Sequence, residues 1–170
     1  VLFRSPLTYY HRTGPVGAMF RELFSRPGGT SADYAMVGLG TGSVSCYAQP
    51  GQKLTFYEID PTVIKLVKPP TYFTYLSDAE KRGAKIDFAI GDARLKLQEH
   101  EGRKYALLLV DAFSSDSIPI HLLTTEGVKL YTERLTDDGF FALHISNKYV
   151  SLEPVVAAIA KELDRKSTRL

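Results

Sequence analysis

The hydrophobic positions of the chain are grouped in short, nearly continuous runs that alternate with segments of helical spacing. Five such runs span Tyr34–Leu39, Lys53–Ile59, Lys85–Ile90, Tyr105–Asp111 and Phe140–Ile145. Because their apolar residues are continuous rather than alternating, each run predicts a strand that is covered on both faces. The pattern is typical of a mostly parallel sheet with helices on both sides, which is an α/β fold.

The segments between these runs predict the covering helices. We expect helices at Ser43–Ala48, Pro61–Val67, Ser77–Arg82, Ala93–His100, Thr124–Leu135 and Val150–Leu163. The second has the clearest start, because Asp60 can cap its first turn and Pro61 suits the first helical position. We find neither an internal repeat nor a low-complexity linker, so the sequence predicts one domain.

Composition and charge narrow the range of partners. The 170 residues are 44% hydrophobic and 24% charged, as in a soluble globular domain. The 21 basic and 19 acidic residues are scattered, which predicts no nucleic-acid partner and no direct membrane contact. The single cysteine, Cys46, cannot form an internal disulfide, and no Cys/His cluster has metal-ligand spacing. We therefore expect no metal and a reducing, cytoplasmic location.

The two ends of the chain look foreign to the domain. Residues 1–5 (VLFRS) and 164–170 (DRKSTRL) resemble translations of the two strands of a sequencing adapter. A natural loop and a natural basic tail are the alternative. On the adapter interpretation, the natural sequence spans residues 6–163 and is an internal piece of a longer protein.

The carboxyl ends of the predicted strands are the place to search for a site, because ligands of open α/β sheets bind there. The first strand runs into a G-x-G-x-G turn, in which Gly38, Gly40 and Gly42 allow a ligand to approach the backbone and Thr41 lies between the last two. Ser43 replaces the third glycine of the dinucleotide pattern G-x-G-x-x-G, which disfavours a nicotinamide cofactor.

Two acidic residues at the next strand ends match the parts of a nucleoside. Glu58, twenty positions after Gly38, can accept hydrogen bonds from both ribose hydroxyls. Asp92 can accept a hydrogen bond from an adenine amino group, or it can cap the helix that follows. Together with the glycine turn they predict an adenosyl cofactor, either S-adenosylmethionine or its decarboxylated form.

The loop after the fourth strand carries two further carboxylates, Asp111 and Asp116. They follow the strand beside which the cofactor's sulfonium is expected. A carboxylate at this point can orient or deprotonate an amine nucleophile, because an ammonium has no lone pair until it loses a proton. We interpret both as candidate catalytic residues. A solvated loop with an Asx turn is the alternative.

Together these motifs resemble the spermidine synthase-like proteins, especially the bacterial group in which such a domain is fused to a transporter-like membrane segment. The matching stretches cover residues 6–163 and include LTYYHRTGP (7–15), the glycine turn, YEID (57–60), FTYLSDA (73–79), GDARL (91–95), DAFSSD (111–116) and HISN (144–147).

The resemblance implies a Rossmann-like class I methyltransferase fold and aminopropyl transfer from decarboxylated S-adenosylmethionine to putrescine, a small-molecule amine. By position, Glu58 would bind the ribose, Asp92 the adenine, and Asp111 would activate the amine, with Asp116 as the second carboxylate. The segment Tyr9–Arg12 matches the region where the family places substrate contacts, with Tyr10 and His11 as the candidates; an entry segment packed on the sheet edge is the alternative. His144 and Asn147 follow the fifth strand and are weaker site candidates. A homodimer and a membrane-anchored parent protein are compatible with the resemblance.

One departure from the family leaves three functions open. True synthases have an aspartate in the glycine turn where this chain has Thr41, and that loss weakens recognition of a cationic tail. An aminopropyltransferase, a methyltransferase using S-adenosylmethionine, and a nucleoside-binding domain without turnover therefore remain as alternatives. Because the family's fold continues with an antiparallel strand pair, we expect this sheet to be truncated after five strands and the isolated piece to be inactive with an exposed edge.

Overall fold

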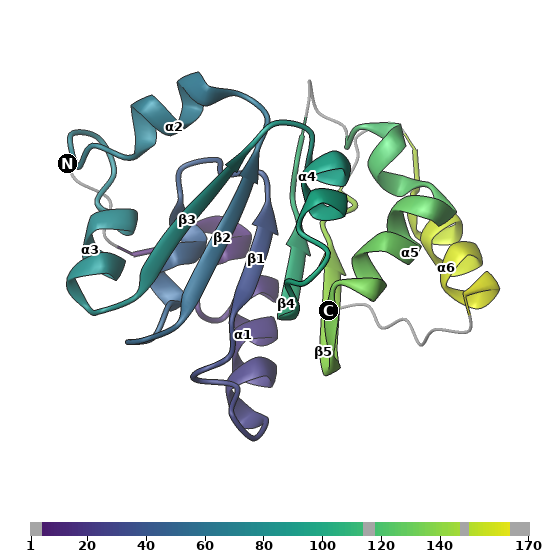
Figure 1. The fold of residues 1–170 in the computed structure, drawn as a ribbon, viewed down its shortest axis with the longest axis horizontal. Helices are drawn as coiled ribbons and strands as arrows, with labels where there is room; N and C mark the ends of the chain where they lie inside the picture. Colours follow the sequence, from purple (N-terminus) through teal and green to yellow (C-terminus); the bar gives the residue numbers. More distant parts are fainter. Residues whose placement is uncertain (1–4, 114–117, 147–149, 164–170) are drawn as a thin grey trace.

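A parallel sheet of five strands, in the order β3-β2-β1-β4-β5, forms the centre of the computed structural model (Figure 1). The structure describes residues 5–113, 118–146 and 150–163. The strands are β1 (Tyr34–Val37), β2 (Lys53–Glu58), β3 (Lys85–Ile90), β4 (Tyr105–Val110) and β5 (Leu135–Leu143). The predicted α/β, Rossmann-like arrangement is thereby confirmed.

The described helices are the α-helices α1 (Pro15–Ser25), α2 (Pro61–Val67), α3 (Tyr75–Lys81), α4 (Ala93–Glu99), α5 (Thr125–Glu133) and α6 (Glu153–Glu162), and the 3₁₀ helices η1 (Thr8–Tyr10), η2 (Ser43–Tyr47) and η3 (Ile120–Leu123). The predicted cap of α2 is confirmed, because the Asp60 side chain accepts a hydrogen bond of 2.7 Å from the Thr62 N–H. Pro61 follows as the first helical residue.

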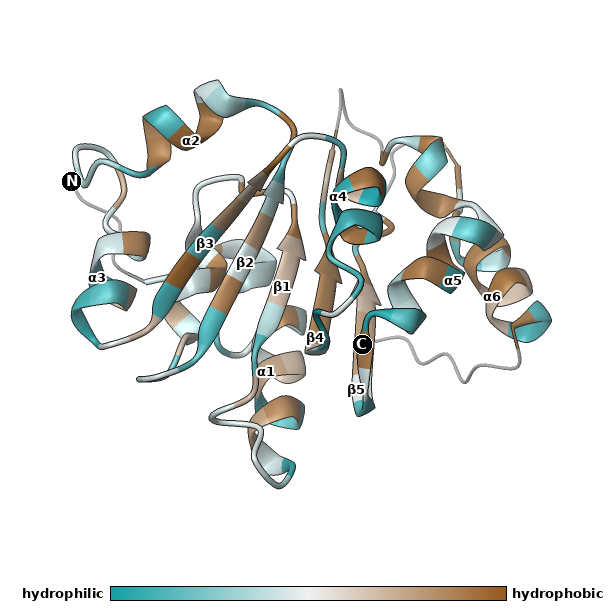
Figure 2. Ribbon diagram, viewed as in Figure 1, coloured by the Kyte–Doolittle hydropathy of each residue, from teal (hydrophilic) through white to brown (hydrophobic). Residues whose placement is uncertain are grey.

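Two hydrophobic layers enclose the sheet, one on each face. Along β1, Tyr34 and Met36 point into the layer that contains α1, η2, α2 and α3. Ala35 and Val37 point into the layer built with α4, η3 and α5. The alternation explains why the strand is apolar at every position, since both of its faces are buried. Figure 2 shows hydrophobic residues along the strands and mixed hydropathy on the helices.

Several predicted boundaries move in the structure. β5 begins at Leu135, five residues before the predicted start at Phe140, and the predicted helix over 124–135 ends at Glu133. Leu135 pairs with Tyr105 and Phe140 with Leu107, so the turn-like residues 136–139 form an irregularity inside the strand. The predicted helix at 43–48 is a short 3₁₀ helix, and α3 begins two residues before the predicted Ser77.

Helix α1 was absent from the predicted elements. Its buried residues Val16, Met19, Phe20 and Leu23 nevertheless follow the spacing of one helix face. Gly14 precedes the helix and Pro15 occupies its first turn, which is a favourable position for proline. Among the residues that the structure describes, no helix is both long and apolar enough to cross a membrane.

Candidate active site

Backbone hydrogen bonds tie the carboxyl ends of all five strands into one row. The Gly91 N–H donates to Glu58 O (2.9 Å) and the Gly38 N–H donates to Tyr57 O (2.8 Å). On the other side, the Asp111 N–H donates to Val37 O (3.0 Å) and the His144 N–H donates to Val110 O (2.9 Å). The structure therefore brings the predicted strand-end residues together along one edge of the sheet, in the order Asp92, Glu58, Gly38, Asp111 and His144.

The glycine turn after β1 needs glycine for two different reasons. Gly38 has a φ of +93°, and a Cβ there would lie 2.4 Å from the backbone oxygen of Asp111. Gly40 also has a positive φ, +52°, but a Cβ there would meet no atom within 4 Å. Gly38 is therefore required by the neighbouring strand end, whereas Gly40 leaves backbone open on the side where a ligand would lie.

Glu58 ends β2 and fixes the conformation of the glycine turn. One carboxylate oxygen accepts a hydrogen bond from the Leu39 N–H and the other accepts one from the Asp60 N–H, both at 2.9 Å. The residue is only 8% exposed. Because an ionised carboxylate has about four acceptor positions, two remain for a ligand. Glu58 is thus held by the backbone in an orientation that leaves capacity for a pair of hydroxyl donors.

Asp92 follows β3 and performs the capping role that the sequence suggested as one of two alternatives. Its side chain accepts a hydrogen bond from the Leu95 N–H at 3.1 Å and so caps α4. The second oxygen lies 3.2 Å from Nε2 of His121. His121 belongs to η3, the 3₁₀ helix that precedes α5. Neither contact excludes a ligand, because the side chain of Asp92 is 28% exposed.

Asp111, directly after β4, is the most heavily bonded side chain of the candidate site. Its Oδ1 lies 2.7 Å from Nδ1 of His144. Its Oδ2 accepts hydrogen bonds from the hydroxyls of Tyr9, at 3.2 Å, and of Tyr10. The side chain is only 3% exposed. Burial of a carboxylate is costly unless it is well bonded, so these three partners stabilise it in place.

Helix η1 carries the two tyrosines across the end of β4. Tyr47 holds Tyr10 in position. The Tyr47 hydroxyl donates to the backbone oxygen of Tyr10 at 2.6 Å, and the Tyr47 ring stacks on Phe20 with the ring centroids 4.3 Å apart. Thr8, just before the tyrosines, has a φ of +56°. Left-handed backbone at a β-branched residue is strained and is retained where the surroundings demand it.

The electrostatics of the cluster keep both tyrosines as hydrogen-bond donors. Burial, and after it the negative charge of Asp111, raises the pKa of Tyr10 well above its ordinary value of 10.0. Burial also raises the pKa of Tyr9, and the charge of Asp111 adds to the effect. Both hydroxyls therefore remain protonated at neutral pH, and each directs its proton toward the carboxylate.

His144 is enclosed by aromatic rings as well as by Asp111. Its ring centroid lies 4.4 Å from that of Tyr9 and 4.6 Å from that of Phe113. Its side chain is 24% exposed, so it retains contact with solvent that Asp111 lacks. The sequence placed His144 among the weaker candidates. Tyr9 was predicted only as part of the segment Tyr9–Arg12, and not as a site residue by itself.

Other predicted residues lie apart from this cluster or outside the described part of the chain. His11 is exposed, and its Nδ1 contacts the Thr13 hydroxyl at 2.9 Å rather than Asp111. Thr41 lies exposed in the glycine turn. Asp116 and Asn147 fall outside the described residues. Within the described ranges, no group of three or more His, Cys, Asp or Glu side chains is arranged to hold a metal ion.

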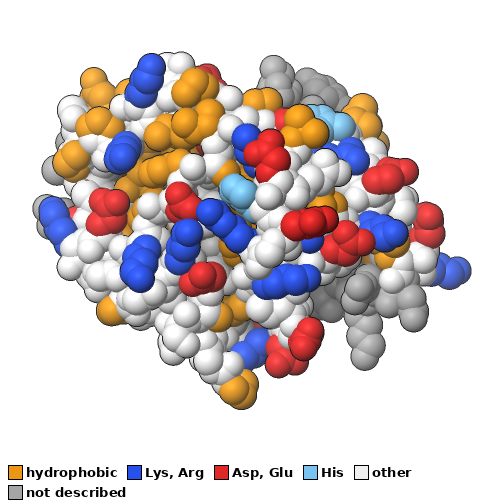
Figure 3. All heavy atoms as spheres, viewed as in Figure 1, with side chains coloured by type: hydrophobic (Ala, Val, Ile, Leu, Met, Phe, Trp, Pro, Cys, Tyr) orange, Lys and Arg blue, Asp and Glu red, His pale blue; other side chains and the backbone are white. Residues whose placement is uncertain are grey.

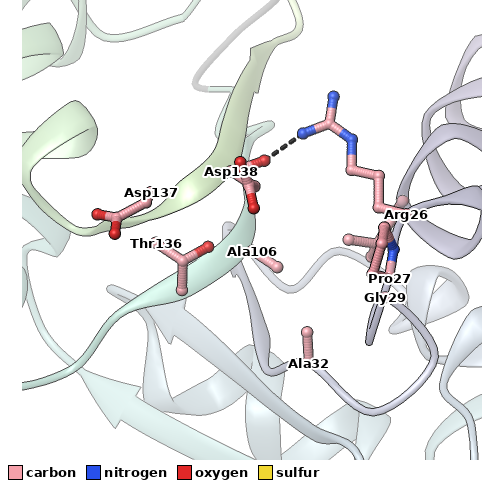
Figure 4. A pocket seen from close by; sticks show the side chains of 9 residues that line it. Arg26, Pro27, Gly29, Ala32, Ala106, Thr136, Asp137 and Asp138 are labelled. Atoms are coloured by element: carbon pink, nitrogen blue, oxygen red, sulfur yellow. Dashed lines mark hydrogen bonds between the residues drawn. The ribbon is translucent and has the colours of Figure 1, made fainter.

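A cavity of about 300 Å³ lies at the opposite end of the sheet (Figure 4). Its lining includes Ala106 at the start of β4 and residues 136–138 of β5, with Arg26 beside them. The Arg26 guanidinium donates to the backbone oxygen of Asp138 and pairs with Glu22 at 2.9 Å. This end contains none of the predicted site residues, and ligands of parallel sheets bind at the other end. We therefore place the candidate site at Asp111.

Comparison with known proteins finds a curated relative that shares part of the sequence. A polyamine aminopropyltransferase from Vibrio vulnificus (strain CMCP6) is 32% identical over 109 residues, which are 61% of this chain and 34% of the relative. The matched region thus spans about a third of the length of that curated relative. No protein-family model matches the chain.

Solved structures with a similar fold include methyltransferases and spermidine synthases. Human methyltransferase-like protein 13, in complex with SAH, superposes with a TM-score of 0.61 at 19% identity over 84% of this chain and 65% of that one. Spermidine synthase from Thermotoga maritima superposes with a TM-score of 0.53 at 17% identity over 79% and 45%. The fold is spermidine synthase-like and class I methyltransferase-like. The resemblance read from the motifs is thereby confirmed at the level of the fold.

Proposed function

We propose that the protein carrying this chain is a transferase that binds an adenosyl sulfonium cofactor and transfers an aminopropyl group to a small-molecule amine. Residues 6–163 would supply the cofactor site and the proton-accepting side of the reaction. The main support for this proposal is one contact. Gly38 of the glycine turn packs against the backbone of Asp111, so the proposed cofactor-binding turn and the buried carboxylate are immediate neighbours.

The residues at the carboxyl edge fit the cofactor. Glu58 has acceptor capacity for the ribose hydroxyls after its two backbone bonds are counted, and Gly40 faces open space. Ile59, next to Glu58, is 68% exposed although it is a large apolar residue. Figure 3 shows hydrophobic side chains gathered on the surface near α2, the helix that follows Ile59. Such a side chain offers an apolar surface for the flat adenine ring.

The Asp111 cluster fits the chemistry that the cofactor requires. When bound, the cofactor supplies a carbon made electrophilic by the neighbouring sulfonium. An amine attacks only after losing a proton, so the site must orient the amine and accept that proton. The carboxylate of Asp111, with Tyr9, Tyr10 and His144 around it, provides a fixed negative charge toward which an ammonium can be drawn.

Methyl transfer from S-adenosylmethionine is the second candidate, and Thr41 favours it. A neutral, exposed threonine in the glycine turn provides no charge for the cationic tail of the decarboxylated cofactor or of a polyamine. The structural similarity to methyltransferases is compatible with this alternative.

The direct test supplies the full-length protein with putrescine and decarboxylated S-adenosylmethionine and measures spermidine by mass spectrometry. We expect product from the wild type and its loss in Glu58→Ala, which removes the ribose acceptor and the anchor of the turn. Folded protein that forms no spermidine would contradict aminopropyl transfer. Calorimetry with both cofactors then decides between the candidates, because a strong preference for S-adenosylmethionine favours methylation.

A further inference from the structure

We propose that Nε2 of His144, rather than the carboxylate of Asp111, takes the proton from the amine nucleophile, and that Asp111 is the positioning residue that prepares His144 for this step. The inference rests on the proposed function and assigns the division of labour within the same site. It starts from the 2.7 Å contact between Asp111 Oδ1 and His144 Nδ1.

The contact with Asp111 determines which ring nitrogen of His144 carries the proton. An ionised carboxylate can only accept hydrogen bonds, so the nitrogen that faces Asp111 must carry the proton. In a neutral imidazole, a proton on Nδ1 leaves Nε2 with a free lone pair. The contact with Asp111 thus selects the tautomer in which Nε2 is the basic atom.

The carboxylate of Asp111 has little remaining capacity to accept hydrogen bonds. Of about four acceptor positions on its carboxylate, three are taken by His144, Tyr9 and Tyr10. Its side chain is 3% exposed, whereas that of His144 is 24% exposed. The carboxylate is therefore enclosed by donors, and the imidazole is the member of the pair that an amine can reach.

Asp111 also stabilises the imidazolium that forms when His144 accepts a proton. When Nε2 accepts a proton, the imidazolium retains its bond to Asp111, and the negative carboxylate stabilises the new charge. Among the described residues, the titratable groups that contact His144 are Asp111 and Tyr9, with Tyr10 bonded to the same carboxylate. Tyr9 and Tyr10 stay neutral because their pKa values are raised, so neither becomes a tyrosinate that would compete with His144 for the proton.

The chemistry balances with these residues. The nitrogen of the amine forms a bond to the carbon beside sulfur, the carbon–sulfur bond breaks, and its electron pair remains on sulfur. The proton that the nitrogen loses passes to Nε2 of His144 and from there to solvent. Asp111 keeps its charge throughout, as a group that orients the base rather than replaces it.

Nuclear magnetic resonance of the full-length protein, labelled with ¹⁵N at histidine, tests the tautomer without any turnover. We expect the neutral ring of His144 to carry its proton on Nδ1 and to leave Nε2 unprotonated. Asp111→Asn should shift the ring toward the other tautomer, because the new amide N–H needs an acceptor. A wild-type His144 protonated on Nε2 would overturn the inference.

Kinetics with two His144 variants test the role of the base. His144→Asn keeps an N–H donor near the Nδ1 position for Asp111 but has no basic nitrogen. We expect it to remain folded and to lose about 10²- to 10⁴-fold in kcat. His144→Ala should be partly rescued by added imidazole. As the matched control, His100→Gln changes a histidine that bonds the Tyr57 hydroxyl at 3.2 Å, away from the site, and should keep activity.

The outcomes separate the inference from the function it rests on. Failure of the wild type to bind cofactor or form product would overturn the proposed function and the inference with it. Product formation in the wild type, with undiminished turnover in His144→Asn, would overturn the inference alone and return the role of base to Asp111.

Discussion

Two aspartates at strand ends, Asp111 after β4 and Asp92 after β3, each face a histidine, yet their surroundings differ sharply. The Asp111–His144 contact is 2.7 Å, with side chains 3% and 24% exposed. The Asp92–His121 contact is 3.2 Å, with side chains 28% and 51% exposed. The same pair of residue types is thus buried at one end of the row and largely solvated at the other.

The difference shows why residue type alone does not identify a catalytic group. Asp92 uses one oxygen to cap α4, and its pairing with an exposed histidine is weakened by water. Asp111 caps no described helix; all three of its side-chain partners, Tyr9, Tyr10 and His144, come from distant parts of the chain. Burial and convergence of donors, rather than the presence of a carboxylate, mark Asp111 as the centre of the site.

The two aspartates should differ most in their effect on kcat when each is changed to asparagine. In Asp111→Asn the amide presents a donor to groups that also donate, and the preferred tautomer of His144 is lost. We expect kcat to fall by about 10³- to 10⁴-fold. Asp92→Asn keeps an effective helix cap and should cost less than about tenfold. Steady-state kinetics at saturating cofactor measure both; equal losses would remove the distinction between the two sites.

A second contrast concerns the glycine that packs against Asp111. Gly38→Ala places a Cβ against the Asp111 backbone at a left-handed φ, so we expect a loss of about 3 kcal/mol in the free energy of unfolding. Gly40→Ala is the matched control: its φ is also positive, but no atom lies within 4 Å, and about 1 kcal/mol should be lost. Urea unfolding measures both. Equal destabilisation would show that the close approach of turn and Asp111 is unimportant.

At the exposed Asp92–His121 pair, the free energy of unfolding should depend on the helix cap that Asp92 forms and little on His121. Asp92→Ala removes the acceptor for the Leu95 N–H and should cost about 1 kcal/mol. His121→Ala breaks only a solvated contact and should cost less than about 0.5 kcal/mol. Thermal unfolding gives both values, and a larger loss in His121→Ala than in Asp92→Ala would contradict the comparison.

The smallest effect should appear at alkaline pH, and in the Asp111 cluster it is measured at Tyr10. The pKa of Tyr10 is raised above 10.0 by burial and by the charge of Asp111, so the neutral hydroxyl stabilises the folded state below that pH. As the pH rises through 10, the unfolded tyrosine ionises first, and stability falls by about 0.4 kcal/mol at pH 10. Tyr10→Phe lacks this pH-dependent contribution to stability. Melting temperatures from pH 8 to 10.5 should therefore converge; a constant difference would contradict the prediction.

The sequence allowed the strand-end residues to be predicted because local patterns determine them. The apolar runs predicted burial on both faces, which holds for the inner strands β1, β2 and β4 but only in part for the edge strands β3 and β5. Asp60-Pro61 marked the start of α2. Parallel strands place their carboxyl ends along one edge, so convergence of Glu58 and Asp111 followed from the fold class alone. These inferences required only nearest neighbours in sequence and the rules of parallel sheets.

The contacts inside the site could not be predicted in the same way. Tyr9 and Asp111 are 102 positions apart, and their hydrogen bond depends on how η1 crosses the end of β4. His144 reaches Asp111 because β5 pairs with β4 in a register that includes an irregularity over 136–139, where the sequence looked like a turn. Long-range register and the path of an irregular segment leave no local signal in the chain.

Calorimetric titration of the full-length protein and two variants with decarboxylated S-adenosylmethionine tests the central claim most directly. Glu58→Gln removes the charge proposed to bind the ribose, and Asp60→Asn changes the neighbouring carboxyl while keeping the helix cap. We expect the wild type and Asp60→Asn to bind the cofactor, and Glu58→Gln to bind it about 10- to 100-fold more weakly. Equal affinity in Glu58→Gln and the wild type, or no binding by folded wild type, would contradict it.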